Sequence, residues 1–181
     1  MKKSVISAFV AGVLALAAGG AFASDGTITF NGALTASTCT INGNGTSSRD
    51  FTVTLPTVST STLTASGQTA GATSYNIALS GCAPVTSTSK AAVFYEAGST
   101  VDPADGRLVV ASGGAQNVKL ELLNNDETQI KAGYSRDLQN SKPADISSGA
   151  ATLNYEVRYY ATGATSAGAA NSSVVYSIDY Q

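Results

Sequence analysis

The sequence has 181 residues, with 12 acidic and 10 basic side chains, no histidine and a formal net charge of −2. Charged residues make up only 12% of the chain, and basic residues are not clustered, which argues against nucleic acid or an anionic membrane surface as a partner. Histidine, the commonest general base and metal ligand, is missing, and the carboxylates show no paired spacing. We therefore expect no catalytic residues, no metal and no cofactor.

The N-terminus has the three regions of a secretory signal peptide. Lys2 and Lys3 provide a basic start, residues 5–18 an apolar run, and a small-x-small cleavage site ends at Ala23. Cleavage there would leave residues 24–181, with a net charge of −4 once the two lysines are lost. The apolar run is too short for a membrane span, so we expect export without membrane insertion after signal cleavage.

Residues 26–36 alternate with the period of a half-buried strand. One face of this segment carries Ile28, Phe30, Gly32, Leu34 and Ala36. If the later strands form a complete sandwich, this apolar face is left over, and an exposed strand of that kind invites pairing with another chain. A second interpretation is a hairpin turning at Asn31-Gly32, although arms this short are marginally stable alone.

The chain has two cysteines, Cys39 and Cys82. In an exported protein with an even cysteine count, we expect them to form a disulfide rather than two free buried thiols. Closing a loop of this length would stabilise the fold by about 4 kcal/mol in the chain-entropy model.

The remaining sequence predicts short strands and no long helix. Alternating or continuous apolar runs occupy residues 51–55, 75–79, 91–95, 107–111, 118–122, 153–159 and 174–180. Turn-forming residues separate them, and residues 59–74 and 163–173 are rich in Ser, Thr, Ala and Gly, which indicates loops within one domain. Several short strands with turn signals between them predict an all-β sandwich.

Three regions resemble the structural subunits of type 1 fimbriae, which are pilins of the chaperone–usher pathway. They are residues 26–36 followed by Cys39-Thr40-Ile41, the strand that leads into Cys82, and residues 153–181. Gly168 is fourteenth from the C-terminus and Tyr180 is second, as in the C-terminal pattern of that family. The resemblance covers essentially all of residues 24–181.

The resemblance implies an all-β, incomplete immunoglobulin-like sandwich that lacks its seventh strand. It divides the chain into a signal peptide (1–23), an N-terminal donor-strand extension (24–37) and a pilin domain (38–181). A periplasmic chaperone would lend a strand to the open groove, and at the outer-membrane usher the extension of the next subunit would replace it. The protein would then polymerise with neighbouring pilin subunits, in a homopolymer or a mixed fibre, and form a cell-surface fimbrium that supports adhesion.

The resemblance also assigns roles to individual residues. In the donor strand, Ile28, Phe30, Leu34 and Ala36 would fill a neighbour's groove, with Gly32 at its shallow point. The C-terminal groove and chaperone-binding positions would be Gly168, Val174, Tyr176, Ile178 and Tyr180. Two alternatives stay open: a minor or adaptor pilin, and a subunit that itself binds carbohydrate through Tyr134, Tyr159 or Tyr160.

Overall fold

The computed structural model of the chain describes Thr29 and residues 38–181. The described residues form nine strands and two short helices. The strands are β1 (Thr38–Gly43), β2 (Thr69–Ala83), β3 (Lys90–Tyr95), β4 (Leu108–Val109), β5 (Val118–Asn124), β6 (Gln129–Ile130), β7 (Ala144–Asp145), β8 (Ala151–Ala161) and β9 (Tyr176–Tyr180). The helices are a 3-10 turn, η1 (Thr60–Thr62), and α1 (Arg136–Gln139). None of the helices in the described part of the chain could cross a membrane.

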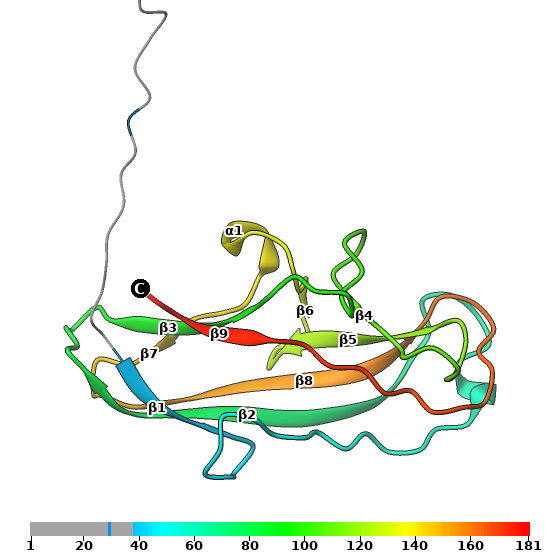
Figure 1. Ribbon diagram of the computed structural model, residues 1–181, viewed down its shortest axis with the longest axis horizontal. Coiled ribbons are helices and arrows are strands. Elements are labelled where there is room, and N and C mark those ends of the chain that lie inside the picture. The colour runs from blue at the N-terminus through cyan, green and yellow to red at the C-terminus, as the bar shows by residue number, and fades with distance from the viewer. Residues whose placement is uncertain (1–28, 30–37) are drawn as a thin grey trace, which may run out of the picture. The chain divides into compact units, whose positions relative to one another are not determined.

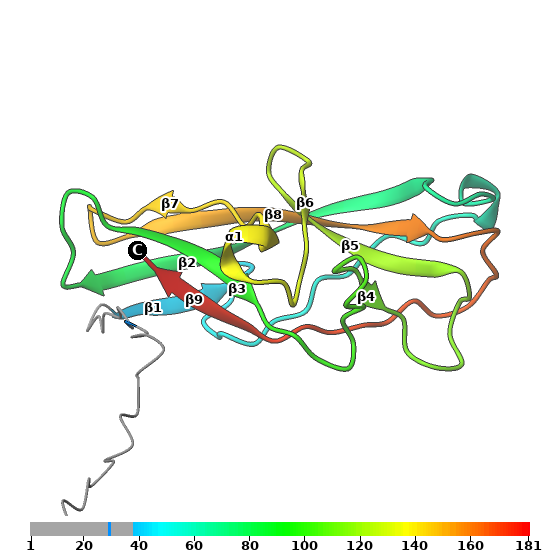
Figure 2. The same ribbon diagram turned by 90° about the horizontal axis from the view of Figure 1, so that it is seen from above.

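The strands form two antiparallel sheets, which confirms the predicted all-β sandwich. The larger sheet has the order β1-β2-β8-β5-β4, with β6 paired to β5, and the smaller has the order β7-β3-β9. Figure 1 shows β3 and β9 in one layer, lying over the layer formed by β1, β2 and β8. The turned view in Figure 2 shows the C-terminal strand β9, in red, at the margin of its sheet beside β3.

The core lies between the two sheets and follows from the alternating sequence, because every second side chain of a strand faces the same side. The buried positions of β2, β8, β5 and β3 form one hydrophobic cluster that includes Tyr75, Ile77, Leu79, Leu153, Tyr155, Val157, Leu120, Leu122, Val93 and Tyr95. The buried tyrosine hydroxyls have partners, as burial of a polar group requires. Tyr75 and Tyr95 share a hydrogen bond of 2.7 Å, and Tyr155 accepts one from the N–H of Val93.

The prediction of a loop over residues 59–74 is wrong for its last part, because β2 begins at Thr69. This part of β2 pairs with the end of β8, where Thr69 lies opposite Tyr160 and Thr73 opposite Val157. The register shifts between these pairs, and Gly71 adopts a positive φ of 68° there. Pairing with a long neighbouring strand, rather than the local Thr, Ala and Gly composition, determines the structure of this segment.

The disulfide between Cys39 and Cys82 is present, as predicted. It joins β1 to β2, which are neighbours in the larger sheet. The chain is therefore held covalently at the point where it enters the sandwich.

The outer face of the larger sheet carries a buried charge. Glu121 on β5 is only 2% exposed and accepts hydrogen bonds from Arg107 and Arg158, with salt-bridge distances of 2.5 and 2.6 Å. The Arg107 guanidinium also lies 3.6 Å from the centre of the Tyr160 ring. Since Arg107 directly precedes β4, this cluster fixes the β4 region against β5 and β8.

Candidate functional site

The strand β9 has one paired edge and one open edge. Lys90 and Gln181 each donate a backbone hydrogen bond to the other, at 2.8 Å in both directions. Bonded and non-bonded pairs alternate along antiparallel strands, so Ser177 and Asp179 direct their backbone groups toward β3. The backbone N–H and C=O groups of Tyr176 and Ile178 therefore point to the opposite edge, where no described strand pairs with them.

A second extended segment faces this edge. Residues 51–58 follow β1, and none of their backbone groups has a hydrogen-bond partner within the described ranges. Phe51, Val53 and Leu55 are half-buried, whereas Thr52 and Thr54 are exposed. The predicted alternation of residues 51–55 is thus present, but the segment belongs to neither sheet.

The space between these two segments is an apolar groove of about 800 Å³. Its floor consists of buried core side chains from β2, β5 and β8, namely Tyr75, Ile77, Leu120, Leu122 and Val157. One rim is formed by residues 49–55 and the other by residues 172–178. The groove combines an apolar floor with unpaired backbone along both rims, which are the two features that bind an added β-strand.

A smaller cavity of about 450 Å³ continues along the same two segments. Its walls are residues 57–60 and 165–170, and Val118 and Tyr159 also line it. The two rims therefore run in opposite directions, since higher numbers on one side face lower numbers on the other. Gly168 lies in this wall, and a Cβ there would come within 2.7 Å of the backbone nitrogen of Ala115. Any side chain at position 168 would thus collide with a neighbouring loop.

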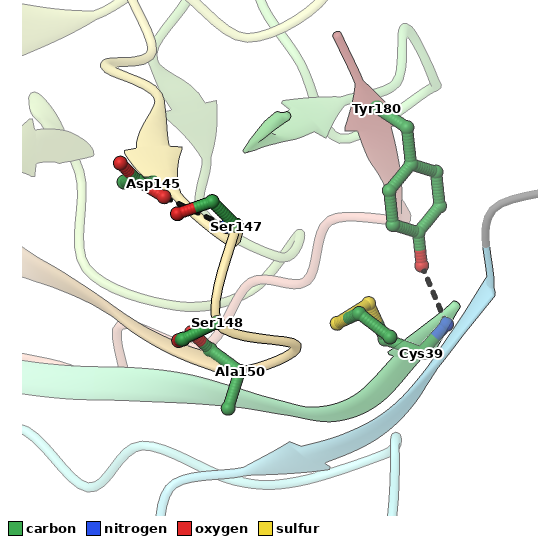
Figure 3. Close-up of a disulfide and its surroundings, with 7 residues drawn as sticks. Cys39, Asp145, Ser147, Ser148, Ala150 and Tyr180 are labelled. Carbon is green, nitrogen blue, oxygen red and sulfur yellow. Dashed lines mark hydrogen bonds between the residues drawn. A yellow bond between two sulfur atoms is a disulfide. The ribbon is translucent and has the colours of Figure 1, made fainter. Parts of the chain in front are cut away.

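Two tyrosines of β9 bind across the sandwich through their hydroxyl groups. The Tyr176 hydroxyl donates to the backbone carbonyl of Arg49, at 2.7 Å. The Tyr180 hydroxyl accepts from the backbone N–H of Cys39, at 3.1 Å, close to the disulfide (Figure 3). Tyr176 lines the groove, but Tyr180 is not among the residues around it.

The structure brings together part of the predicted set. Val174, Tyr176 and Ile178 line the groove, Gly168 lines the smaller cavity, and Tyr180 lies beyond the groove at the end near Cys39. The five donor-strand residues predicted on residues 26–36, and the signal peptide, lie outside the described residues. The roles of all these residues in strand donation and chaperone binding stay predictions.

The sequence analysis did not assign the floor or the opposite rim of the groove. Tyr75, Ile77 and Val157 show the same alternation as any other core residue, so periodicity cannot reveal that no strand of the described residues lies above them between the rims. The rim residues Phe51 and Val53 did carry a signal, since their run was recognised as extended.

The tyrosines considered for carbohydrate binding have other partners or surroundings. Tyr134 donates its hydroxyl hydrogen to the carbonyl of Ala104, at 3.0 Å, and Arg107 covers the ring of Tyr160. The side chain of Tyr159 faces the opposite side of β8 from that of Tyr160, because successive residues of a strand face opposite sides. Tyr159 lines the smaller cavity. No group of side chains in the described part of the chain has the composition of a metal site.

The chain is similar to known fimbrial proteins. The family model FimA, described as type-1 fimbrial protein, A, matches residues 55–181. The major fimbrial subunit SMF-1 of Stenotrophomonas maltophilia is 45% identical over 174 residues, covering 93% of this chain and 99% of that protein. The F17 fimbrial protein of Escherichia coli is 40% identical over 178 residues, covering 96% of this chain and 97% of that protein.

Solved structures show a related fold. An antigen and type I fimbria protein of Burkholderia pseudomallei aligns with a TM-score of 0.54 and 26% identity, over 79% of this chain and 99% of that one. The P pilus rod subunit PapA aligns with a TM-score of 0.58 over 79% of this chain and 99% of that one, and its 14% identity makes this a likeness of fold alone.

Proposed function

Because the chain belongs to the type-1 fimbrial protein family and is a structural subunit of a cell-surface fimbria, we propose that it polymerises by donating a strand to its neighbour. The donor is residues 26–36, called the donor segment from here on, and the acceptor is the groove beside β9 of a second copy. The observation that carries this proposal is the apolar groove with unpaired backbone along both rims.

The donor segment suits the groove in length and pattern. An 11-residue strand extends about 36 Å, and a strand of about ten residues is needed to follow residues 51–60 past both cavities. Its inward positions would be Ile28, Phe30, Leu34 and Ala36, with Gly32 at the shallow point. Burial of three or four such side chains stabilises a junction by about 5–10 kcal/mol.

The family also supports a route to the surface. An empty groove leaves backbone groups unpaired along its two rims, and exposed edges of that kind aggregate unless they are covered. In our proposal a periplasmic chaperone supplies the covering strand after cleavage of residues 1–23, and the outer-membrane usher exchanges it for the donor segment of the next subunit. The chain then consists of the extension 24–37 and the pilin domain 38–181.

The protein's relatives are structural fimbrial subunits, and we propose a structural rather than a catalytic role here as well. The similarity to a major subunit of S. maltophilia supports a place in the fimbrial shaft.

Deletion of the donor segment tests the proposal. The shortened chain should accumulate as a complex with the chaperone, because its groove is intact, but should form no fibres in electron micrographs. A matched pair of substitutions sharpens the test: Leu34→Asp should block fibre growth, whereas Ala33→Asp, on the opposite face of the same strand, should be tolerated. Normal fibres from the deletion would refute strand donation.

A further inference from the structure

One side chain connects the two rims of the groove. Tyr176 belongs to β9, and its hydroxyl donates to the carbonyl oxygen of Arg49 on the facing rim, at 2.7 Å. Its ring meets the ring of Phe51 edge-on, with centroids 6.2 Å apart and planes at 64°. Both partners of Tyr176 line the groove, so these contacts run across the space that a strand would enter.

The same residue offers backbone to an incoming strand. The N–H and C=O groups of Tyr176 face the open edge of β9, because Ser177 and Asp179 make the bonds to β3. The neighbouring groove residues Val174 and Ile178 have apolar side chains and form no hydrogen bond across it. Burial raises the pKa of Tyr176, and the charge of Asp50 raises it further, so the hydroxyl keeps its proton and remains a donor.

We propose that Tyr176 is a latch across the empty groove, and that a donor strand from a second copy of this chain must release it before pairing with β9. This inference rests on the proposed function and concerns the regulation of the same site. While the latch is closed, the Tyr176 ring and hydroxyl hold the two rims together and shield part of the floor. When a strand enters, the bond to Arg49 breaks, and the backbone of Tyr176 gains a partner.

Tyr134 provides a matched control. Its hydroxyl also donates to a backbone carbonyl, that of Ala104 at 3.0 Å, but neither residue lines the groove or the smaller cavity. Removal of the Tyr134 hydroxyl therefore takes away a bond of the same kind without opening the path of the donor strand.

The test measures how fast a peptide with the sequence of residues 26–36 binds to the mature chain. The peptide carries a fluorescent label and is present in large excess over nanomolar protein, so that it outcompetes association between copies. Loss of one hydrogen bond from the ground state should make Tyr176→Phe bind about three- to tenfold faster than the native chain. The rate for Tyr134→Phe should stay within about twofold of the native rate.

Each result has a distinct meaning. Equal rates for the native chain and Tyr176→Phe would overturn the latch and leave strand donation intact, whereas no binding by any of the three proteins would refute strand donation itself. Acceleration by both substitutions would also overturn the latch, since the effect would then be general loosening. If Tyr176→Phe does not fold, 3-fluorotyrosine placed at position 176 gives a second measurement: its fluorine signal should shift on peptide binding, and an unchanged signal contradicts the latch.

Discussion

The hydroxyl of Tyr180 accepts a hydrogen bond from the backbone N–H of Cys39, so the last strand of the sandwich is bound to the first. The bond crosses from the smaller sheet to the larger one, 141 residues apart in sequence. It lies beside the disulfide that joins β1 to β2 (Figure 3). The entry of the chain into the domain and its C-terminal strand therefore form one connected unit.

Removal of this bond should destabilise the domain. Tyr180→Phe keeps the ring but leaves the Cys39 N–H without its acceptor, and we expect the free energy of unfolding to fall by about 1 kcal/mol. Urea denaturation with the disulfide intact measures the change. Tyr159→Phe is the control, because the Tyr159 hydroxyl has no hydrogen-bond partner in the described part of the chain. Equal losses from the two substitutions would show that the bond to Cys39 contributes nothing specific.

Glu121 should be among the most sensitive charged positions. Glu121→Gln leaves Arg107 and Arg158 facing each other without the carboxylate that both contact, and we expect a loss of about 2–4 kcal/mol in unfolding free energy. The two arginines are partly exposed, and water lowers the cost toward the smaller value. Thermal or urea unfolding measures it, with Glu127→Gln on an exposed turn as the control. A change of less than about 0.5 kcal/mol at position 121 would contradict the importance of this cluster.

The free energy of unfolding should fall in acid but change little with pH near neutrality. The hydrogen bond from Lys142, and then that from Thr128, lower the pKa of Asp126 to about 2, and a bond from Lys119 likewise lowers the pKa of Asp102. Because these pKa values are lower in the folded state, the stabilisation is complete above about pH 4 and is lost as the pH falls toward 2. With no histidine, no side chain of ordinary pKa titrates between about pH 5 and 8.

Melting temperatures measured from pH 2 to 8 test this dependence. Lys142→Gln should reduce the loss of stability between about pH 4 and 2, because the pKa of Asp126 then returns toward its usual value. Lys131→Gln should leave the fall in melting temperature between about pH 4 and 2 unchanged, since Lys131 forms no salt bridge within residues 38–181. If the melting temperature of Lys142→Gln falls in acid just as that of the native chain does, the Lys142–Asp126 pair does not contribute to the pH dependence.

Two residues of the C-terminal segment, Val175 and Ile178, should respond differently to replacement by threonine. Both residues belong to one rim of the groove, but Ile178 is half-buried there, whereas Val175 is 72% exposed. Ile178→Thr should weaken binding of the donor-segment peptide about tenfold, because the apolar contact area of an isoleucine is lost. Val175→Thr should bind nearly as the native chain does. Fluorescence anisotropy titration of the peptide gives both affinities, and equal weakening would mean that β9 does not present its inner face to the donor.

Much of this fold follows from the sequence, because alternation locates strands wherever one face is buried. Residues 75–79, 118–122 and 153–159 fall within β2, β5 and β8, and the cysteines pair as the exported context predicts. The start of β2 at Thr69 was missed, since pairing with β8 outweighs local composition. β9 begins at Tyr176 rather than at Val174, because the preceding residues bond to loops, as Ser173 does to Thr100.

The groove itself was harder to predict from the residues. Ile77 and Leu122 are buried core residues and also the floor of an open site, and their alternation is the same in both roles. What distinguishes them is that no strand of residues 38–181 lies between the two rims above them. The absence of a neighbouring strand does not change the periodicity of the strands that are present. The resemblance to fimbrial subunits, rather than the alternation of residues within 38–181, therefore led to the groove.

The opposite directions of the two rims have a consequence for the direction in which a bound strand can run. A strand between them must lie parallel to one rim and antiparallel to the other, whichever of its ends enters first. Backbone hydrogen bonding is therefore nearly indifferent to which way a bound strand runs. The direction of a bound strand is therefore determined by the difference between the two ends of the groove. One end has an aromatic wall at Phe51 and Tyr176, and the other has a tighter glycine–alanine wall at Gly168.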